Sequence, residues 1–251
     1  PIFFDNLLEE LIHHYRNNSL YRKFCDKQNF NPNSYIGDLA GIPPIPVYVF
    51  KALGHKLSSV NSRSITGKLQ SSATSGKPST ILIDKITSRR QTRSMARTIS
   101  EVLGSKRQPF CVMDIDPSSA NSGNLGARLA AISGYLNFAS SASYFVDAAE
   151  KDAPLKFQDT KFVEYMNALD KSVPIVIFGF TFVLYHTVLK SLGKGDAIFK
   201  LPVGSKIIHI GGWKKLESLK VDKEKFNEDM SRLFGISKID VVDIYGFTEQ
   251  M

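Results

Sequence analysis

The chain has 251 residues, of which 43% are hydrophobic and 22% charged, the balance of a globular protein with one large or two small domains. Its net charge of +8 suits anionic ligands such as nucleotides, and because the excess is spread along the chain we expect no nucleic-acid partner. Two cysteines are too few for a disulfide framework and favour a reducing, cytoplasmic compartment. The longest apolar run, Val173–Leu189, is interrupted by Pro174 and Gly179, so no membrane span is expected.

The N-terminal part begins with an apolar stripe of helical period over Ile2–Asn17, and Asn18–Asn29 predicts a second helix. Gly41–Val47 holds three prolines and predicts an extended connector. Ser58–Lys68 is polar, and Gly67 indicates a turn.

Short apolar runs and longer helical patterns then alternate. The expected strands are Ile81–Ile83, Phe110–Ile115, Ser143–Val146, Ile175–Ile177, Lys206–Ile210 and Asp240–Ile244. The expected helices are Ser88–Gly104, Leu125–Leu136, Thr160–Asp170, Phe180–Leu192 and Lys223–Phe234. This alternation predicts an α/β fold of mostly parallel sheets flanked by helices, with ligands at the carboxyl ends of the strands. We expect residues 1–60 to form a helical lead-in with its proline-rich connector and residues 61–251 an α/β nucleotide-binding core.

One polar loop precedes the strand Ile81–Ile83 and reads Ser71-Ser72-Ala73-Thr74-Ser75-Gly76-Lys77-Pro78-Ser79. Hydroxyls, backbone N–H groups and one lysine are the groups that phosphate oxygens require, and Gly76 permits close approach of a ligand. A plain surface turn is the alternative, since the loop fits neither the common P-loop pattern nor a dinucleotide fingerprint.

Other strand-end residues allow two interpretations each. Asp114 and Asp116 close a strand and offer a carboxylate pair to a metal, although turn and cap chemistry is the favoured interpretation. The segment Phe178–Phe182 either walls an apolar substrate pocket or belongs to the core.

Two further turns follow strands. In His209-Ile210-Gly211-Gly212-Trp213-Lys214-Lys215, paired glycines let a flat ring approach the backbone; the alternative is a strand-ending turn with a buried indole. In Asp243-Ile244-Tyr245-Gly246-Phe247-Thr248-Glu249-Gln250-Met251, Tyr245 can stack on a base, Thr248 can donate to a phosphate and Glu249 can bind Mg²⁺. A structural turn is again the alternative.

Together, these three turns resemble the adenylate-forming superfamily of acyl-CoA synthetases, luciferases and peptide-synthetase adenylation domains. Its phosphate loop, roughly Thr-Ser-Gly-Thr-Thr-Gly-x-Pro-Lys, is similar at Ser72, Thr74, Gly76 and Pro78. Its Tyr-Gly-x-Thr-Glu motif is matched in full by residues 245–249, and residues 211–212 resemble its Gly-Gly turn near adenine. Within the superfamily the chain is most similar to the LuxE-like acyl-protein synthetases, with phenylacetate-CoA ligases as relatives.

The resemblance implies a role for each matching residue. Residues Ser71–Lys77 would hold the β- and γ-phosphates of ATP, and Gly211, Gly212 and Tyr245 would frame adenine. Thr248 would contact the α-phosphate, and Thr248 and Glu249 are the implied catalytic residues, with Glu249 and Thr74 on Mg²⁺. The full set of implied nucleotide-binding residues is Ser71, Ser72, Thr74, Ser75, Gly76, Lys77, Gly211, Gly212, Trp213, Tyr245, Gly246 and Thr248.

The implied reaction activates a carboxylic acid, for the LuxE-like branch a fatty acid, as an acyl-adenylate and then transfers the acyl group to a thiol. The acceptor would be a protein cysteine in that branch, with an acyl reductase as a possible partner, or CoA in the ligase branch. Ala73 and Ser79 depart from the superfamily's glycine and lysine, so a scaffold that lost the chemistry is a third alternative. We expect the chain to be part of an N-terminal domain, because the superfamily's ribose-binding aspartate and C-terminal lid with its lysine follow the last motif. Neither Cys25 nor Cys111 is expected to accept the acyl group.

Overall fold

The structure is a computed structural model that describes residues 2–71, 77–118, 132–148, 155–193, 199–213 and 218–246. The chain divides into two compact units, here called the N-terminal unit, up to Arg93, and the C-terminal unit, residues 94–246. The division falls inside helix α4 (Lys85–Leu103), whereas we expected a boundary near residue 60. Among the described residues, no helix is both long and apolar enough to cross a membrane.

The N-terminal unit packs short helices and a β-hairpin around its own small core. Its elements are α1 (Ile2–Asn17), α2 (Ser19–Lys27), η1 (Leu39–Gly41), α3 (Val47–Leu53), η2 (Gly54–Leu57), η3 (Ser62–Ser64), β1 (Ile65–Gln70) and β2 (Thr80–Asp84). The buried residues Tyr21, Cys25 and Phe30 form the centre of that core. Asn18 joins the first two helices: its Oδ1 accepts from the backbone of Leu20 and Tyr21, which caps α2.

One expectation for this unit is wrong, and one predicted strand is confirmed with an antiparallel partner. Gly67 lies inside strand β1 opposite Ile83 of β2, so the polar segment before the loop is a strand and not a turn. The segment is largely exposed and lacks the apolar alternation that predicts a strand. It forms a strand because its backbone hydrogen-bonds to β2. The predicted strand Ile81–Ile83 lies in β2, but its partner is antiparallel and it does not join the parallel sheet.

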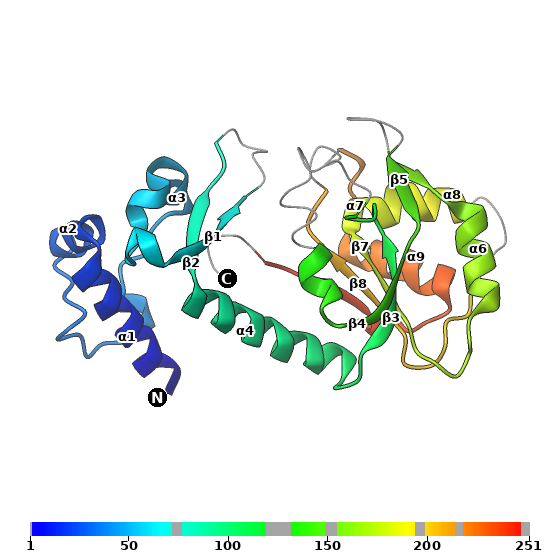
Figure 1. The fold of residues 1–251 in the computed structure, drawn as a ribbon, viewed down its shortest axis with the longest axis horizontal. Coiled ribbons are helices and arrows are strands. Elements are labelled where there is room, and N and C mark those ends of the chain that lie inside the picture. The colour runs from blue at the N-terminus through cyan, green and yellow to red at the C-terminus, as the bar shows by residue number, and fades with distance from the viewer. Residues whose placement is uncertain are drawn as a thin grey trace. The chain divides into compact units, whose positions relative to one another are not determined.

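The C-terminal unit contains the expected parallel sheet. Its strands are β3 (Gln108–Met113), β4 (Ala139–Tyr144), β7 (Val176–Phe180), β8 (Lys206–Ile210) and β9 (Val241–Ile244), in the spatial order β4-β3-β7-β8-β9 with every neighbour parallel. The strand order can be followed by colour in Figure 1, from green β3 and β4 to red β9. The prediction of a mostly parallel α/β sheet is therefore confirmed. A separate antiparallel pair, β5 (Val146–Ala148) with β6 (Leu155–Phe157), was not predicted, because three-residue strands show no periodicity.

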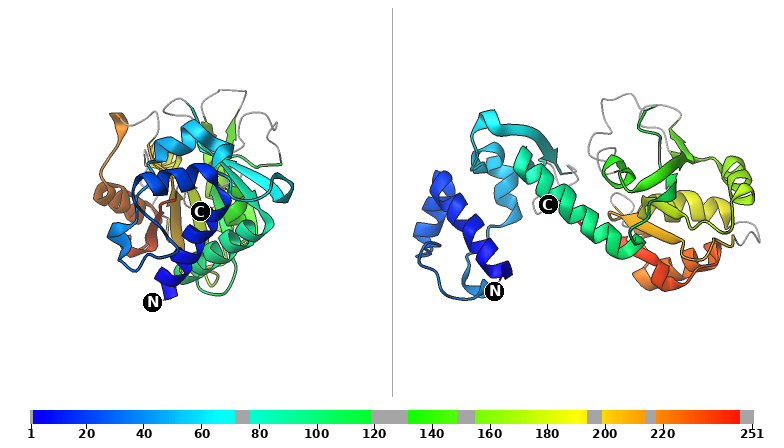
Figure 2. Two further views of the ribbon diagram at one scale, coloured as in Figure 1. Left: turned by 90° about the vertical axis from the view of Figure 1, so that its left-hand side faces the viewer. Right: turned by 60° about the horizontal axis from the view of Figure 1, so that its bottom comes forward.

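Helices cover both faces of this sheet. They are α6 (Asp159–Ala168), a continuous helix formed by α7 (Thr181–Val183), the π-helical η4 (Leu184–Leu189) and α8 (Lys190–Leu192), and α9 (Lys223–Phe234); η6 (Lys238–Asp240) is a short 3₁₀ turn. His209 of β8 contacts Phe226 of α9 with ring centroids 4.5 Å apart. On the opposite face Phe178 of β7 contacts Tyr135 in the helical residues 132–136, with centroids 4.9 Å apart. Figure 2 shows these layers from two further directions.

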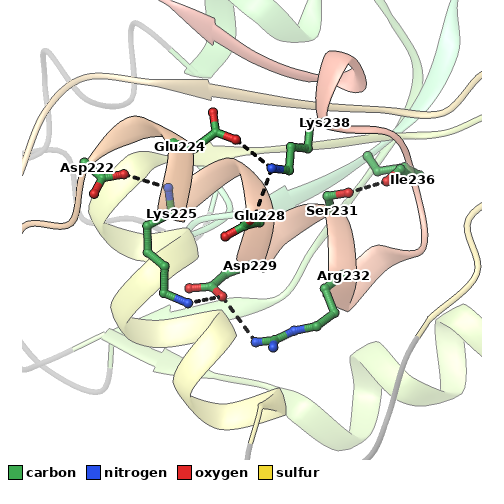
Figure 3. A network of polar contacts seen from close by, with 9 residues as sticks. All are labelled: Asp222, Glu224, Lys225, Glu228, Asp229, Ser231, Arg232, Ile236 and Lys238. Atoms are coloured by element: carbon green, nitrogen blue, oxygen red, sulfur yellow. Dashed lines mark hydrogen bonds and ion pairs between the residues drawn. The ribbon is translucent and has the colours of Figure 1, made fainter.

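Helix α9 is held in place by polar contacts at both ends (Figure 3). Asp222 caps it by accepting from the backbone N–H of Lys225 at 2.7 Å, and Gly235 ends it in the left-handed conformation. The buried carboxylate of Asp229 pairs with Lys225 at 2.7 Å and with Arg232 at 3.2 Å. These contacts stabilise α9 itself, and its packing on the sheet comes from side chains such as Phe226, which contacts His209.

Candidate functional site

The carboxyl ends of the parallel strands bring several predicted residues to one edge of the sheet. Phe180 pairs with Ile210, and Ile210 pairs with Ile244, so Thr181, Gly211 and Tyr245 are the next residues on three neighbouring strands. In the spatial order β4-β3-β7-β8-β9, strand β4 lies on one side of β3, and the later strands β7, β8 and β9 lie on the other. The strand order therefore reverses between β3 and β7, next to β8, and open α/β sheets bind ligands near such a reversal, beyond the carboxyl ends of the strands.

Gly211 has a backbone conformation that requires glycine. Its φ is +71°, and a Cβ at this position would lie 3.1 Å from Cδ1 of Phe180. Thr181, at the start of α7, holds the turn because its hydroxyl lies 2.7 Å from the carbonyl oxygen of Gly211 and 3.3 Å from that of Ile210. The first glycine of the pair is thus explained by the fold itself.

Gly212 and Gly246 differ from Gly211, since the structure does not require glycine at either position. Each has an ordinary φ, and a Cβ built there would have no described atom within 4 Å. On the neighbouring strand Tyr245 is 84% exposed, so its ring lies at the surface of the same edge. Open backbone beside an exposed aromatic ring is an arrangement that a flat ligand can occupy.

Trp213 has a packing role. Its side chain is 7% exposed and contacts the rings of Tyr185 and His186 in η4, with centroids 5.4 Å and 5.5 Å apart. Tyr185 in turn donates to Oδ2 of Asp229 at 3.2 Å. The indole therefore anchors the end of the Gly-Gly turn to the helical layer, in agreement with the alternative of a strand-ending turn with a buried indole, and its nucleotide-binding role stays a prediction.

His209 lies beneath the Gly-Gly turn and is buried. Its Nδ1 is 3.0 Å from the Thr181 hydroxyl and 3.8 Å from Oδ1 of Asp243. The other carboxylate oxygen of Asp243, Oδ2, is 3.5 Å from Nζ of Lys223. Burial lowers the pKa of His209 to about 4; the attraction of Asp243 acts in the opposite direction and Lys223 adds to the lowering. The imidazole is neutral near pH 7, so its contact with Asp243 is not an ion pair.

The ends of the predicted phosphate loop lie in the N-terminal unit. The backbone N–H of Ser71 donates to the carbonyl of Ser79 at 3.1 Å, and the N–H of Ser79 donates to Oγ of Ser71 at 2.8 Å. These bonds extend the β1–β2 ladder and close the loop between them. Lys77 is exposed, whereas Ser79 is fully buried, so a lysine at position 79 would have to bury its charge here.

Of the remaining candidate residues, the two aspartates accept hydrogen bonds within turns and the phenylalanines lie in the core. Oδ1 of Asp114 accepts from the N–H of Ile115, and Oδ1 of Asp116 accepts from the N–H and hydroxyl of Ser118, which agrees with the turn interpretation. Phe178 and Phe180 are buried. In the part of the chain that is described, no cluster of three or more His, Cys, Asp or Glu side chains could hold a metal ion.

Both cysteines are buried thiols. Burial raises the pKa of Cys111 to about 12, with a hydrogen bond from Tyr165 acting weakly the other way, and burial also raises the pKa of Cys25. A thiol of such a pKa is almost entirely protonated near pH 7 and is a poor nucleophile. This agrees with the expectation that neither cysteine accepts an acyl group.

Six predicted site residues lie outside the described residues, namely Ser72, Thr74, Ser75, Gly76, Thr248 and Glu249. The predicted site residues that the structure describes belong to two units. Ser71 and Lys77 are in the N-terminal unit, and the C-terminal unit holds Gly211, Gly212, Trp213, Tyr245 and Gly246. Sequence reasoning assigned no role to Thr181 or His209. A threonine directly after a strand and a histidine two residues before Gly-Gly were the only signals available.

Comparison with known proteins extends the sequence resemblance to the whole chain. Residues 1–251 match the family described as acyl-protein synthetase, LuxE. A long-chain-fatty-acid–luciferin-component ligase from Aliivibrio fischeri is 25% identical over 243 residues, which are 95% of this chain and 60% of the relative. The chain thus spans less than two thirds of that relative's length.

Two solved structures are similar to parts of this chain at low sequence identity. A 2-hydroxyisobutyryl-CoA ligase in complex with 2-HIB-AMP and CoA is similar with a TM-score of 0.54 and 16% identity over 89% of this chain and 45% of the ligase. ATP-bound MatB from Rhodopseudomonas palustris has a TM-score of 0.45 and 14% identity over 76% of this chain and 31% of its own. The first similarity shows that this chain shares the fold of the matching part of that ligase. With the family match across all 251 residues, the chain belongs to the LuxE family of acyl-protein synthetases.

Proposed function

We propose that the protein to which this chain belongs activates a fatty acid with ATP and transfers the acyl group to a thiol, and that the base of ATP binds at the carboxyl edge of β8 and β9. The observation that carries the proposal is the pairing of Ile210 with Ile244, because the Gly211–Gly212 turn and the exposed Tyr245 directly follow these adjacent strand ends. A base would stack on the Tyr245 ring and lie against the uncovered backbone of Gly212.

The chemistry requires two displacements. The fatty carboxylate attacks the α-phosphorus of ATP, so that a carboxyl–phosphate bond forms and pyrophosphate leaves. A thiolate then attacks the acyl carbon, so that a thioester forms and AMP leaves. Negative charge accumulates at phosphorus in the first step, and hydrogen-bond donors must offset it. The family match and the predicted roles of residues 71–77 and Thr248 support this assignment.

The proposed reaction also uses Mg²⁺, and only the sequence resemblance to the superfamily supports this part of the proposal. Glu249 and Thr74, its implied ligands, lie outside the described residues. Protein cysteine is the proposed acceptor because the chain belongs to the acyl-protein synthetase family. Release of acyl-CoA in place of acyl-protein would assign the full-length protein to the ligase branch.

The position of the base is tested by filling the space above Gly212. Gly212→Val in the full-length protein adds a branched side chain where no described atom lies within 4 Å, so it should leave the fold intact and displace a stacked base. We expect the Kd for ATP to rise at least about tenfold, and fatty-acid-dependent pyrophosphate exchange to fall equally at subsaturating ATP. Equilibrium binding and exchange assays measure the two effects.

A matched control is Gly67→Val, because Gly67 also has an ordinary φ and open space around its Cβ but lies in strand β1. This variant should bind ATP like the wild type. An unchanged Kd in Gly212→Val, with the wild type active, would remove the base from this edge of the sheet. A wild type inactive with every fatty acid and acceptor would refute the proposed activity.

A further inference from the structure

Three polar groups under the Gly-Gly turn form a hydrogen-bonded chain whose direction can be deduced. The Thr181 hydroxyl oxygen lies 2.7 Å from the carbonyl oxygen of Gly211 and 3.0 Å from Nδ1 of His209. Two oxygen atoms at 2.7 Å repel each other unless a proton lies between them. Because a carbonyl cannot donate, the Thr181 hydroxyl donates its single proton to Gly211.

The direction of that bond fixes the tautomer of His209. With its proton committed to Gly211, the Thr181 hydroxyl can only accept from the imidazole, so Nδ1 carries the hydrogen. The other ring nitrogen, Nε2, then has a lone pair, and it is buried without a hydrogen-bond partner among the described residues. A protonated imidazole would have to bury an unpaired N–H at Nε2, so the geometry favours the neutral ring independently of charge.

The same bond fixes the orientation of the peptide between the two glycines. A trans peptide is planar, and its N–H points opposite to its C=O. The Gly211 carbonyl is directed at Thr181, so the N–H of Gly212 is directed away from Thr181, and it finds no acceptor among the described residues. This N–H belongs to the glycine whose Cβ position is open.

We propose that His209 and Thr181 are positioning residues that orient the Gly211–Gly212 peptide so that the Gly212 N–H donates a hydrogen bond to the bound nucleotide. This inference rests on the proposed function and deepens it: the edge of the sheet supplies a directed donor as well as an open surface. The ligand must present an acceptor there, such as a ring nitrogen of the base or an oxygen of the ribose. Neither positioning residue touches the nucleotide.

The affinity test uses Thr181→Val, which has almost the same shape as threonine and lacks the hydroxyl. In the full-length protein the Kd for ATP should rise about tenfold, because the freed peptide no longer holds its N–H outward. Thr181→Ser restores the hydroxyl and should recover most of the affinity. His209→Asn retains a donor near the position of Nδ1 and should bind ATP better than His209→Leu.

Ser205→Ala controls for a merely structural loss. Ser205 is also buried, and its hydroxyl accepts from the N–H of Ile175 at 3.0 Å at the opposite, amino end of β7 and β8. It should lower the melting temperature about as much as Thr181→Val and leave the Kd for ATP unchanged. A wild-type Kd in Thr181→Val, or an equal rise in Ser205→Ala, would overturn the positioning role.

A measurement without nucleotide separates this inference from the proposed function. Nitrogen-15 chemical shifts of labelled His209 should have the pattern of a neutral ring protonated at Nδ1, and Thr181→Val should change that pattern. Protonation at Nε2 would overturn the deduced hydrogen-bonded chain from His209 through Thr181 to Gly211, even in a protein that binds ATP. The expected tautomer in a protein that binds no ATP would overturn both the role of these residues in nucleotide binding and the proposed function. The hydrogen-bonded chain would then be a structural feature alone.

Discussion

At the scale of single residues, the burial of His209 gives the C-terminal unit a defined sensitivity to acid. In the sheet His209 is in register with Gly179 and Asp243 of the neighbouring strands, and its ring contacts Phe226 of α9. Its pKa is about 4 in the folded protein and 6.5 in the unfolded chain, so the unfolded state binds more protons between these values. The stability that depends on the neutral ring is complete above pH 6.5 and is lost as the pH falls toward 4.

We therefore expect the wild type to lose about 2 kcal/mol more unfolding free energy than His209→Asn between pH 7 and pH 5. Urea unfolding of the 251-residue chain, followed by the fluorescence of Trp213, measures this difference because Trp213 is the single tryptophan and is buried in the same unit. If the unfolding free energies of the two proteins changed equally with pH, the pKa of His209 would be the same in the folded and the unfolded chain, which would contradict this prediction.

At the scale of elements, two helices of the C-terminal unit end at glycines with positive φ but unequal surroundings. Gly235 after α9 has φ +60°, and a Cβ there would lie 2.7 Å from the carbonyl oxygen of Phe199. Gly104 after α4 has φ +76° and no described atom within 4 Å of a Cβ. The first site combines backbone strain with a collision, whereas the second has backbone strain alone.

Gly235→Ala should accordingly lower the unfolding free energy by about 3 kcal/mol, and Gly104→Ala by about 1 kcal/mol. The two variants share the chemical change and the sign of φ, so their difference isolates the contacts with Phe199 and Lys200. Denaturant titrations of both proteins provide the values. Equal losses would mean that the segment around Phe199 moves aside at no cost.

At the scale of the whole molecule, the two units have separate hydrophobic cores. One surrounds Tyr21, Cys25 and Phe30, and the other is built on the parallel sheet. Ser71 and Lys77 of the predicted phosphate loop belong to the first unit, and the residues proposed to bind the base belong to the second. The proposed function also requires Thr248 and Glu249, which lie outside the described residues.

Glu249→Gln tests this requirement in the full-length protein. Loss of the carboxylate proposed to bind Mg²⁺ should lower fatty-acid-dependent pyrophosphate exchange on the order of 10²-fold or more and leave the circular dichroism spectrum unchanged. Glu224→Gln is the matched control, because its exposed carboxylate pairs only with Lys238 among the described residues. Wild-type exchange in Glu249→Gln would contradict the role.

The sequence by itself determined the motifs and most of the parallel strands, although the predicted strand Ser143–Val146 covers only the end of β4 and the first residue of the antiparallel β5. Lys206–Ile210 and Lys223–Phe234 were predicted with their observed bounds, because a buried apolar run and a capped amphipathic stripe are local signals. The Gly-Gly turn and the family resemblance were likewise readable from residue order, since each motif is contiguous.

Only the tertiary structure decided which partners the segments have. It paired residues 81–83 with the polar strand β1, and it brought Thr181 and His209, 28 positions apart in the chain, together beneath Gly211. It also distinguished Gly211, which the fold requires, from Gly212, which it leaves open. The physical reason is that strand pairing, burial and the direction of a hydrogen bond depend on neighbours distant in sequence, and local patterns carry no record of those neighbours.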